Sequence, residues 1–393
     1  MSISVLFIGS SLNLANGGVD RVTGVLSSFF EKSGISCFFI FRSQVKNCVP
    51  KEKGLVLEYV QKRDKWEPSF RKFLIDKKIS IIINQAQWDR NLASFLSDLK
   101  KERLCKIITC FHVSPNFYEP IRSFKGKIID IPFKMIHGTV RALYGAKLAT
   151  EYSDKFILLS NSFIDDFVNR AGIDKNASNI CAIPNPLSFT DSFYYEFSEK
   201  KKQVLICTRL EDQQKNISSA LRIWKSVSEV RTDWNLVIAG HGPSENDLKA
   251  YAKELQLERV SFIGCTDNPQ NLYKESSIFM MTSRYEGFGM TLTEAQQFGC
   301  IPFAFDNFSV LHDIIDNEKN GIIISSNSED EYAKKMLSLM ESYEKLGTIA
   351  KQAIKDCQKF SIENIGRQWL WLFDSLIHEK RGIYDRKQNG QIL

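Results

Sequence analysis

Two glutamates and the glycines between them carry the residue types best suited to binding a sugar phosphate. Glu286 and Glu294 enclose a seven-residue segment that contains Gly287 and Gly289. A carboxylate accepts hydrogen bonds from vicinal hydroxyl groups, and glycine lets backbone N–H groups approach an anion because it has no Cβ. This pattern predicts a site in which the two glutamates hold a ribose and a hexose on either side of a diphosphate, which is the shape of a nucleotide sugar.

The elements around these residues are predicted to place the glycines in a turn between a strand and a helix. The apolar run 277–281 predicts a strand, and the segment 292–298 predicts a helix that Gly299 ends at its C′ position. The positive end of such a helix favours a bound phosphate. A second interpretation of Glu294 stays open, because Thr291-x-x-Glu294 is also a capping box that would suit any helix start.

The motif and its flanks resemble those of a known enzyme family. Glu286-Gly-Phe-Gly, the later Glu294-Ala, and Gly299 with Ile301-Pro302 are similar to the E-x7-E signature of the retaining glycosyltransferases of family 4. The resemblance extends over nearly the whole chain. It implies an α/β architecture of the GT-B type, with two Rossmann-like domains facing a central cleft.

The resemblance also assigns the site residues. Arg209 follows the predicted strand 203–207 and Lys215 follows a polar loop, so both cations could neutralise a diphosphate, although two exposed cations are the alternative. Thr208 and Asn216 stand where the family usually has glycine. The implied catalytic residues are Glu286, His112, Arg209 and Lys215. The implied donor-binding residues are Gly17, Gly18, Arg209, Lys215, Gly240, Glu286, Gly287, Phe288, Gly289, Met290, Thr291 and Glu294.

A glycine pair near the N-terminus predicts a further contact with the donor. Gly17 and Gly18 precede a predicted helix, and a Gly-Gly loop at this place in the family faces the donor phosphate; a simple flexible turn is the alternative. The spacing of these glycines departs from G-x-G-x-x-G, and the predicted strand 36–41 ends at Arg42 rather than at an acid. A nicotinamide-dependent oxidoreductase is therefore disfavoured.

His112 is the candidate active-site residue of the N-terminal half. It follows the predicted strand 106–111, and the carboxyl ends of parallel strands are where open α/β sheets bind ligands. An imidazole could donate a hydrogen bond to a sugar hydroxyl. A lone histidine is more often structural, but the position matches that of the family's N-domain histidine, which implies the active-site role.

The length of 393 residues favours two domains. We predict an N-terminal Rossmann-like acceptor domain at 1–190 and a C-terminal Rossmann-like domain at 191–361 that binds the nucleotide sugar. The stretch 187–202 is the predicted linker between them. A final helix at about 362–380 is expected to pack back on the first domain, as the resemblance implies.

Composition predicts a cytoplasmic protein. The hydrophobic content of 43% and the charged content of 25% are typical of soluble globular proteins, and no apolar run approaches the roughly 18 residues that a bilayer helix needs. The N-terminus lacks a basic leader. Nine cysteines without a CxxC pair agree with a reducing compartment.

The charge pattern bears on partners and cofactors. Basic and apolar residues are mixed over 117–144, which predicts contact with the inner face of the plasma membrane or with a lipid-linked acceptor; an ordinary amphipathic layer is the alternative. The net charge of +6 fits a nucleotide or a phosphorylated lipid, and no nucleic-acid partner is predicted. No D-x-D triplet occurs, so we expect neither a metal nor another cofactor.

The sequence thus predicts a retaining, metal-independent glycosyltransferase that moves a hexose from a nucleotide sugar to a hydroxyl of a glycan or lipid-linked acceptor. The resemblance implies cell-surface polysaccharide or lipopolysaccharide assembly and a front-face route, in which the departing phosphate helps to take the acceptor's proton. Glu286 would orient the donor sugar and Glu294 the ribose. Two alternatives stay open: a nucleotide-sugar epimerase of the same fold, and a sugar-binding or scaffold protein with an inactive site.

Overall fold

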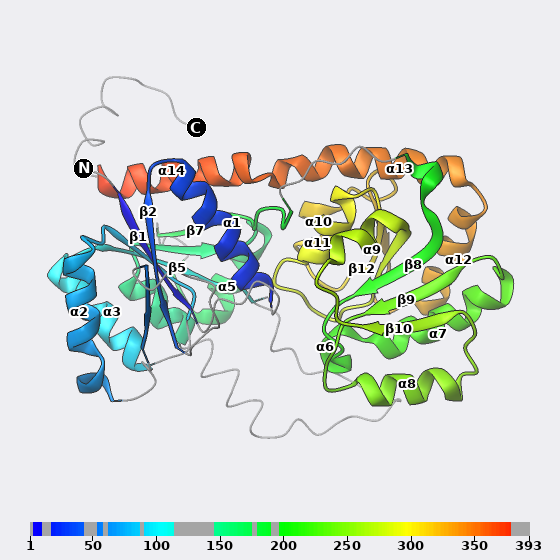
Figure 1. Cartoon of the computed structure of the whole chain (residues 1–393), viewed down its shortest axis with the longest axis horizontal. Coiled ribbons are helices and arrows are strands. Elements are labelled where there is room, and N and C mark those ends of the chain that lie inside the picture. Colours follow the sequence, from blue (N-terminus) through cyan, green and yellow to red (C-terminus); the bar gives the residue numbers. More distant parts are fainter. Residues whose placement is uncertain are drawn as a thin grey trace. The chain divides into compact units, whose positions relative to one another are not determined.

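The chain forms two compact units in the computed structural model (Figure 1). One unit comprises Met1–Pro186 and Ile362–Leu393, and the other comprises Leu187–Ser361. The structure describes residues 3–9, 17–42, 53–57, 62–86, 90–113, 145–174, 179–189 and 196–378. Within these ranges each unit contains one sheet, and every strand pairing is parallel.

The first unit has the strand order β3-β2-β1-β4-β5-β6-β7. Its strands are β1 (Ser4–Gly9), β2 (Ser36–Phe41), β3 (Gly54–Val56), β4 (Ile81–Asn84), β5 (Lys106–Cys110), β6 (Lys155–Leu158) and β7 (Ile180–Ala182). Its helices are α1 (Gly18–Lys32), η1 (Arg63–Lys65), α2 (Glu67–Asp76), α3 (Arg90–Glu102), α5 (Ser162–Ala171) and α14 (Ile362–Ile377), and residues 145–152 are also helical. The strands are nearly continuous apolar runs because both faces of a parallel sheet are covered.

The last helix of the chain packs against the first helix. A Cβ atom at Gly366 of α14 would lie only 2.3 Å from the ring of Phe29, so glycine lets the two helices approach closely at this point. The rings of Phe30 and Phe373 pack edge to face with their centroids 5.0 Å apart. Apolar burial of this kind explains why α14 belongs to the first unit although it follows the second in the sequence.

The boundary between the units lies after residue 186 rather than after residue 190. The backbone N–H of Leu187 donates a hydrogen bond to the carbonyl of Phe360 (2.8 Å), and the side chain of Gln297 donates to the carbonyl of Phe189 (2.6 Å). These bonds hold the start of the predicted linker in the second unit. The end of the same stretch is also structured, since a short helix and the first strand of the second sheet begin before residue 202.

The second unit has the strand order β10-β9-β8-β11-β12-β13. Its strands are β8 (Lys201–Cys207), β9 (Asn235–Ala239), β10 (Val260–Gly264), β11 (Ser276–Met281), β12 (Ile301–Phe305) and β13 (Ile322–Ile324). Its helices are η2 (Phe197–Glu199), α6 (Asp212–Lys215), α7 (Ile217–Val230), α8 (Glu245–Glu254), α9 (Pro269–Glu275), α10 (Met290–Gln297), α11 (Leu311–Ile314), α12 (Glu329–Met340), α13 (Tyr343–Asp356) and η3 (Cys357–Phe360).

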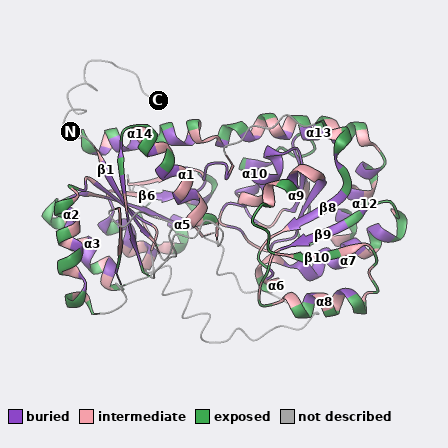
Figure 2. Ribbon diagram, viewed as in Figure 1, coloured by how far each residue is buried: buried purple, intermediate pink, exposed green. Residues whose placement is uncertain are grey.

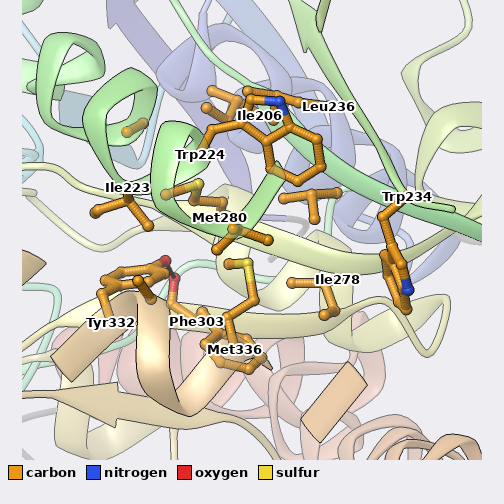
Figure 3. Close-up of a cluster of buried hydrophobic side chains, with 14 of the residues drawn as sticks. Ile206, Ile223, Trp224, Trp234, Leu236, Ile278, Met280, Phe303, Tyr332 and Met336 are labelled. Carbon is orange, nitrogen blue, oxygen red and sulfur yellow. Dashed lines mark hydrogen bonds between the residues drawn. The ribbon is translucent and has the colours of Figure 1, made fainter. Parts of the chain in front are cut away.

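A large aromatic and aliphatic core supports this second sheet. Trp224 and Trp234 are fully buried in it, together with Ile278 and Met280 of β11 (Figure 3). The hydroxyl of Tyr332 donates a hydrogen bond to the carbonyl of Phe303 (2.7 Å), so the one polar group of that ring is satisfied. Figure 2 shows β8 and β9 mainly in the colour of buried residues. The middle of the sheet is therefore a rigid base for the loops at its edges.

The strand order brings two particular loops together. β8 pairs with β9 on one side and with β11 on the other, and Val204 and Leu205 are in register with Ile278 and Phe279. From β8 the strands add on one side of the sheet as far as β10, and from β11 they add on the other side. The order of the strands therefore reverses between β8 and β11. Ligands of open α/β sheets bind outside the carboxyl ends of the strands at such a switch point.

Two findings concern the predicted relation to membranes. Within the described ranges, no helix is both long and apolar enough to cross a bilayer. The segment 117–144, for which membrane or acceptor contact was predicted, lies outside the described residues.

Candidate active site

An ion pair joins the loops that follow β8 and β11. The ammonium nitrogen of Lys215 lies 2.6 Å from Oε1 of Glu286, and the hydroxyl of Ser283 donates to the same oxygen at 2.7 Å. The side chains of Lys215 and Glu286 are 16% and 9% exposed, respectively. The sequence predicted that both residues contribute to one site, and the structure brings them into contact across 71 positions of the chain.

The two oxygens of the Glu286 carboxylate differ in their contacts. Both protein donors use Oε1, and within the described part of the chain no hydrogen bond to Oε2 is formed. A carboxylate has capacity for about four hydrogen bonds. Because Lys215 and Ser283 hold the group in one orientation, Oε2 can accept a hydrogen bond from a hydroxyl group of a bound sugar.

Arg209 lies near this pair but is not joined to it. Its side chain is 63% exposed and forms an ion pair with Glu211. Burial raises the pKa of the Tyr285 phenol, the charges of Glu211 and Glu286 add to this rise, and Arg209 opposes it. Arg209 is therefore within electrostatic range of the residue next to Glu286, and an exposed arginine can turn toward an anion.

Gly240 supports the loop that carries Arg209. Its φ of +137° is rarely adopted by other residues, and a Cβ atom here would lie 1.8 Å from the carbonyl oxygen of Thr208. Its own N–H donates to the carbonyl of Gly264 at 2.8 Å. The structure thus shows Gly240 in a close backbone approach between the loops after β8 and β9, where its N–H already has an acceptor.

The start of α10 presents unsatisfied backbone donors. The N-cap is Gly289 (φ +85°), no side chain caps the helix, and Leu292 is the first residue whose N–H bonds back to the Gly289 carbonyl (2.8 Å). The N–H groups of Met290 and Thr291 precede this bond, as expected for the first turn of a helix. No acidic residue lies in that turn, so the positive helix end is available to an anion.

The local helix predictions for this segment were right at one end and wrong at the other. The helix ends as predicted, with Gly299 at C′ in the left-handed conformation (φ +63°). It starts at Met290 rather than at residue 292, because Gly289 takes the N-cap. The capping-box interpretation of Thr291 and Glu294 is therefore wrong.

Glu294 is buried and bonded to protein hydroxyls. Its side chain is 2% exposed, Oε1 accepts from the hydroxyl of Ser188 (2.5 Å) and Oε2 from the hydroxyl of Tyr273 (2.8 Å). These bonds tie α10 to α9 and to the start of the unit. A ribose can reach this carboxylate only if the surrounding side chains give way, because Glu294 is almost fully buried, so the predicted ribose contact stays a prediction.

The remaining residues of the glycine-rich turn contribute through the backbone. The Phe288 side chain is buried and packs edge to face on Phe360, with centroids 5.4 Å apart. This ring anchors the turn in the core and cannot reach a ligand. Gly287, which lies between Glu286 and Phe288, is half-buried, so its backbone is the part of this segment that can approach a donor.

His112, in the first unit, is a buried histidine whose ring has no hydrogen-bond partner among the described residues. It follows β5, and within the described residues neither ring nitrogen forms a hydrogen bond although both are buried. Burial lowers the pKa of the imidazole to about 4. A neutral ring donates from one nitrogen and accepts at the other, so His112 has both capacities unused.

Gly17 and Gly18 lie at the start of α1. Gly17 is the N-cap in an extended conformation (φ −176°), and Gly18 is the first helical residue. The loop at 10–16 lies outside the described residues. The predicted contact of this glycine pair with the donor phosphate stays a prediction.

The expectation of a metal-free site also stays a prediction. Among the described residues, no group of three or more histidine, cysteine, aspartate or glutamate side chains is arranged to hold a metal ion.

Three residues of the site could not be predicted from the sequence motifs. Ser283 orients Glu286, and Ser188 and Tyr273 satisfy Glu294. Serine and tyrosine occur throughout the sequence, and only Ser283 stands next to the motif.

Part of the second unit matches a known family model. Residues 189–356 match the model of the glycosyl transferases group 1, and the glycosyltransferase family 4 that the motifs predicted fits this match. Solved structures support the GT-B fold. The lipopolysaccharide outer core galactosyltransferase WaaB in its apo form matches with a TM-score of 0.69 and 20% identity over 96% of this chain and 100% of that chain. Anabaena HepE in complex with UDP and glucose matches with a TM-score of 0.74 and 16% identity over 95% and 100%.

Curated relatives match over different shares of their length. The lipopolysaccharide 1,6-galactosyltransferase of Salmonella typhimurium is 25% identical over 84% of this chain and 88% of that protein. An uncharacterized glycosyltransferase of Haemophilus influenzae is 26% identical over 49% of this chain and 54% of that protein. In several relatives, as in the latter, the match spans only about half of the protein's length.

Proposed function

We propose that this protein is a retaining glycosyltransferase that moves a sugar from a nucleoside diphosphate sugar to a hydroxyl group of a glycan or lipid-linked acceptor. The observation that carries the proposal is the Lys215–Glu286 pair, which lies at the carboxyl ends of β8 and β11 and leaves one carboxylate oxygen without a partner among the described residues. The names of relatives that act on lipopolysaccharide and on undecaprenol-linked glycans support this class of acceptor.

Positive groups of the second unit would bind the diphosphate. Lys215 supplies one charge, the N-terminus of α10 supplies N–H donors, and Arg209 supplies a second charge when it turns away from Glu211. These groups stabilise the negative charge that develops on the leaving nucleotide, which is the work a metal ion does in other enzymes. Because similar solved structures contain UDP, a uridine diphosphate sugar is the first donor to test.

Glu286 would position the sugar. Its Oε2 accepts a hydrogen bond from a sugar hydroxyl, and this contact sets the anomeric carbon against the acceptor. In the front-face route the bond from this carbon to the phosphate oxygen breaks, and the acceptor oxygen bonds to the same face. The acceptor's proton passes to the departing phosphate. No enzyme nucleophile is needed, which suits a carboxylate whose other oxygen is held by Lys215 and Ser283.

The first unit would supply further residues for the reaction. His112 offers a neutral ring with both nitrogens unpartnered in the described structure, and Gly17 and Gly18 would face the donor phosphate. Contact of segment 117–144 with the acceptor or the membrane, and a location at the cytoplasmic face of the plasma membrane, stay predictions of the sequence.

Nucleotide binding is the first test. The purified protein is heated with UDP, GDP, ADP and their common sugar conjugates, with and without EDTA. A ligand that binds only the folded state stabilises it by about 2.7 kcal/mol at a hundredfold excess over Kd. We expect a shift of the melting temperature with one nucleotide series that EDTA does not change. A folded protein whose melting temperature no nucleotide shifts would contradict the proposal.

The reaction itself is tested with the donor found in that screen. We expect the anomeric configuration of the donor to be kept in the product, as NMR spectroscopy would show. Glu286→Gln should lower kcat about 100-fold, because the neutral amide weakens both the sugar contact and the hold on Lys215. Glu275→Gln, on an exposed ion pair at the amino end of the sheet, is the control. Full activity of Glu286→Gln would refute its role, and isomerised donor without acceptor would indicate an epimerase.

A further inference from the structure

Arg284, within the glycine-rich motif, donates hydrogen bonds to the carbonyl groups of α6. This helix has only four residues, and the hydrogen bond that closes it runs from the N–H of Asn216 to the carbonyl of Asp212 (2.9 Å), so its other carbonyl groups need partners from elsewhere. The hydrogen bonds of Arg284 run from Nη1 to the carbonyls of Asp212 (2.6 Å) and Gln213 (3.0 Å), from Nη2 to Oδ1 of Asn216 (2.6 Å), and from the backbone N–H to the carbonyl of Gln214 (2.9 Å). The guanidinium therefore spans α6 from its first residue to the residue after its end.

Asn216 supplies an acceptor that glycine would lack. It adopts the left-handed conformation (φ +52°), which asparagine tolerates better than most residues. Glycine would adopt it without cost, but only asparagine adds the Oδ1 atom that accepts from Arg284. The hydroxyl of Thr282 donates to the carbonyls of both Lys215 and Asn216 at 3.0 Å, which holds the same turn from the end of β11.

These contacts enclose the backbone of Lys215. Arg284 anchors Gln214 on one side of it and Asn216 on the other, and the side chain of Gln214 donates back to the carbonyl of Tyr285 at 3.3 Å. A lysine side chain has about 2 kcal/mol of rotamer entropy to lose when it is held in one conformation. A fixed backbone leaves the ammonium group fewer positions, and the observed one is 2.6 Å from Glu286.

We propose that Arg284 is a positioning residue, which acts through α6 and Asn216 to set Lys215 against Glu286 and the diphosphate of the donor. The mechanistic part of this inference rests on the proposed function. The side chain of Arg284 donates its hydrogen bonds to the segment around Lys215, at Asp212, Gln213 and Asn216. Its effect on catalysis therefore passes through Lys215.

A lysine at position 284 provides the first test. Lysine keeps the charge but not the planar group that reaches three acceptors, so Arg284→Lys should increase hydrogen exchange at residues 212–216 by at least tenfold. Exchange in β8 should stay as in the unchanged protein, which shows that the unit is folded. Arg231→Lys, which alters a two-bond pair with Asp233, is the matched control. Unchanged exchange at residues 212–216 would overturn the proposal.

Epistasis with Lys215 distinguishes positioning from a general structural role. Arg284→Lys should lower kcat about tenfold with a smaller change in donor KM, because charge on the leaving group develops in the transition state. In a Lys215→Met background, the same change should have no further effect on kcat. Asn216→Gly should have part of the effect of Arg284→Lys. If the effects of Arg284→Lys and Lys215→Met multiply, Arg284 does not act through Lys215 and the proposal is overturned.

Different experiments test the proposed function and the positioning role of Arg284. A wild-type protein that binds no nucleotide would count against the proposed function. Hydrogen exchange at residues 212–216 tests the contact between Arg284 and α6 in either case, because it needs neither donor nor acceptor.

Discussion

The Lys215–Glu286 ion pair should contribute more to the free energy of unfolding than the distance between its charged atoms alone suggests. Both side chains are mostly buried (16% and 9% exposed) and their charged atoms are 2.6 Å apart. Exposed pairs contribute about 0–1 kcal/mol, whereas breaking a buried pair costs about 3–5 kcal/mol because one charge stays behind unpaired. Lys215→Met leaves the Glu286 carboxylate with Ser283 as its one donor within the described ranges, so we expect it to lower the free energy of unfolding by about 3 kcal/mol.

A double-mutant cycle measures the pair itself. Lys215→Met, Glu286→Gln and the double variant are compared, and the coupling energy should be about 2 kcal/mol. The free energy is measured by native-state hydrogen exchange at Leu205 and Ile206, which are buried in β8 and report on the second unit alone.

An exposed ion pair with the same distance between its charged atoms provides the control for this cycle. Lys201 and Glu275 are also 2.6 Å apart, but their side chains are 62% and 47% exposed. Lys201→Met and Glu275→Gln should therefore couple by less than about 0.5 kcal/mol. Equal coupling energies for the two pairs would refute the argument from burial.

Three further changes have defined outcomes. Gly240→Ala should destabilise the second unit by at least about 3 kcal/mol in thermal or denaturant unfolding, because the new Cβ would overlap the Thr208 carbonyl. Gly264→Ala is the control and should cost about 1 kcal/mol, since this glycine has a φ of +72° but no atom within 4 Å of the added Cβ. Equal costs for the two changes would contradict the close approach at Gly240. Burial lowers the pKa of His112 to about 4 from 6.5, so the unfolded chain binds more protons below pH 6.5. The first unit should therefore lose up to about 3 kcal/mol between pH 6.5 and 4, and His112→Gln should remove this dependence. Glu294→Gln should cost about 1–3 kcal/mol, since an amide has one oxygen for two hydroxyl donors; a melting temperature equal to that of the unchanged protein would show that these bonds are not needed.

Local patterns in the sequence were sufficient for β11 and for the end of α10. The apolar run at 277–281 lies within β11, and the glycine after the last helical residue of α10 adopts the left-handed conformation that its position predicts. Such features depend on near neighbours. Side-chain periodicity and the conformational range of glycine act over a few residues, so they can be read from a short window.

The start of α10 shows where local patterns fail. A threonine followed three residues later by a glutamate is a strong signal for a capping box. The glutamate instead bonds to Ser188 and Tyr273, which lie 106 and 21 positions away in the sequence. A buried carboxylate gains more from two fixed hydroxyl donors than from one backbone group at a helix end, and packing decides which donors are within reach.

The sequence by itself determined the architecture of two α/β units, the glycine-rich turn after a strand, and the match of residues 189–356 to the glycosyl transferases group 1. Tertiary structure decided the partners of each charge. Lys215 bonds to Glu286, Arg209 bonds to Glu211, and Arg284 bonds to α6, although all three cations were equally available in the sequence. The reason is that parallel pairing of β8 with β11 brings together loops about 70 residues apart, at a switch point of the open sheet. Hydrogen-bond geometry within those loops then selects one partner for each group.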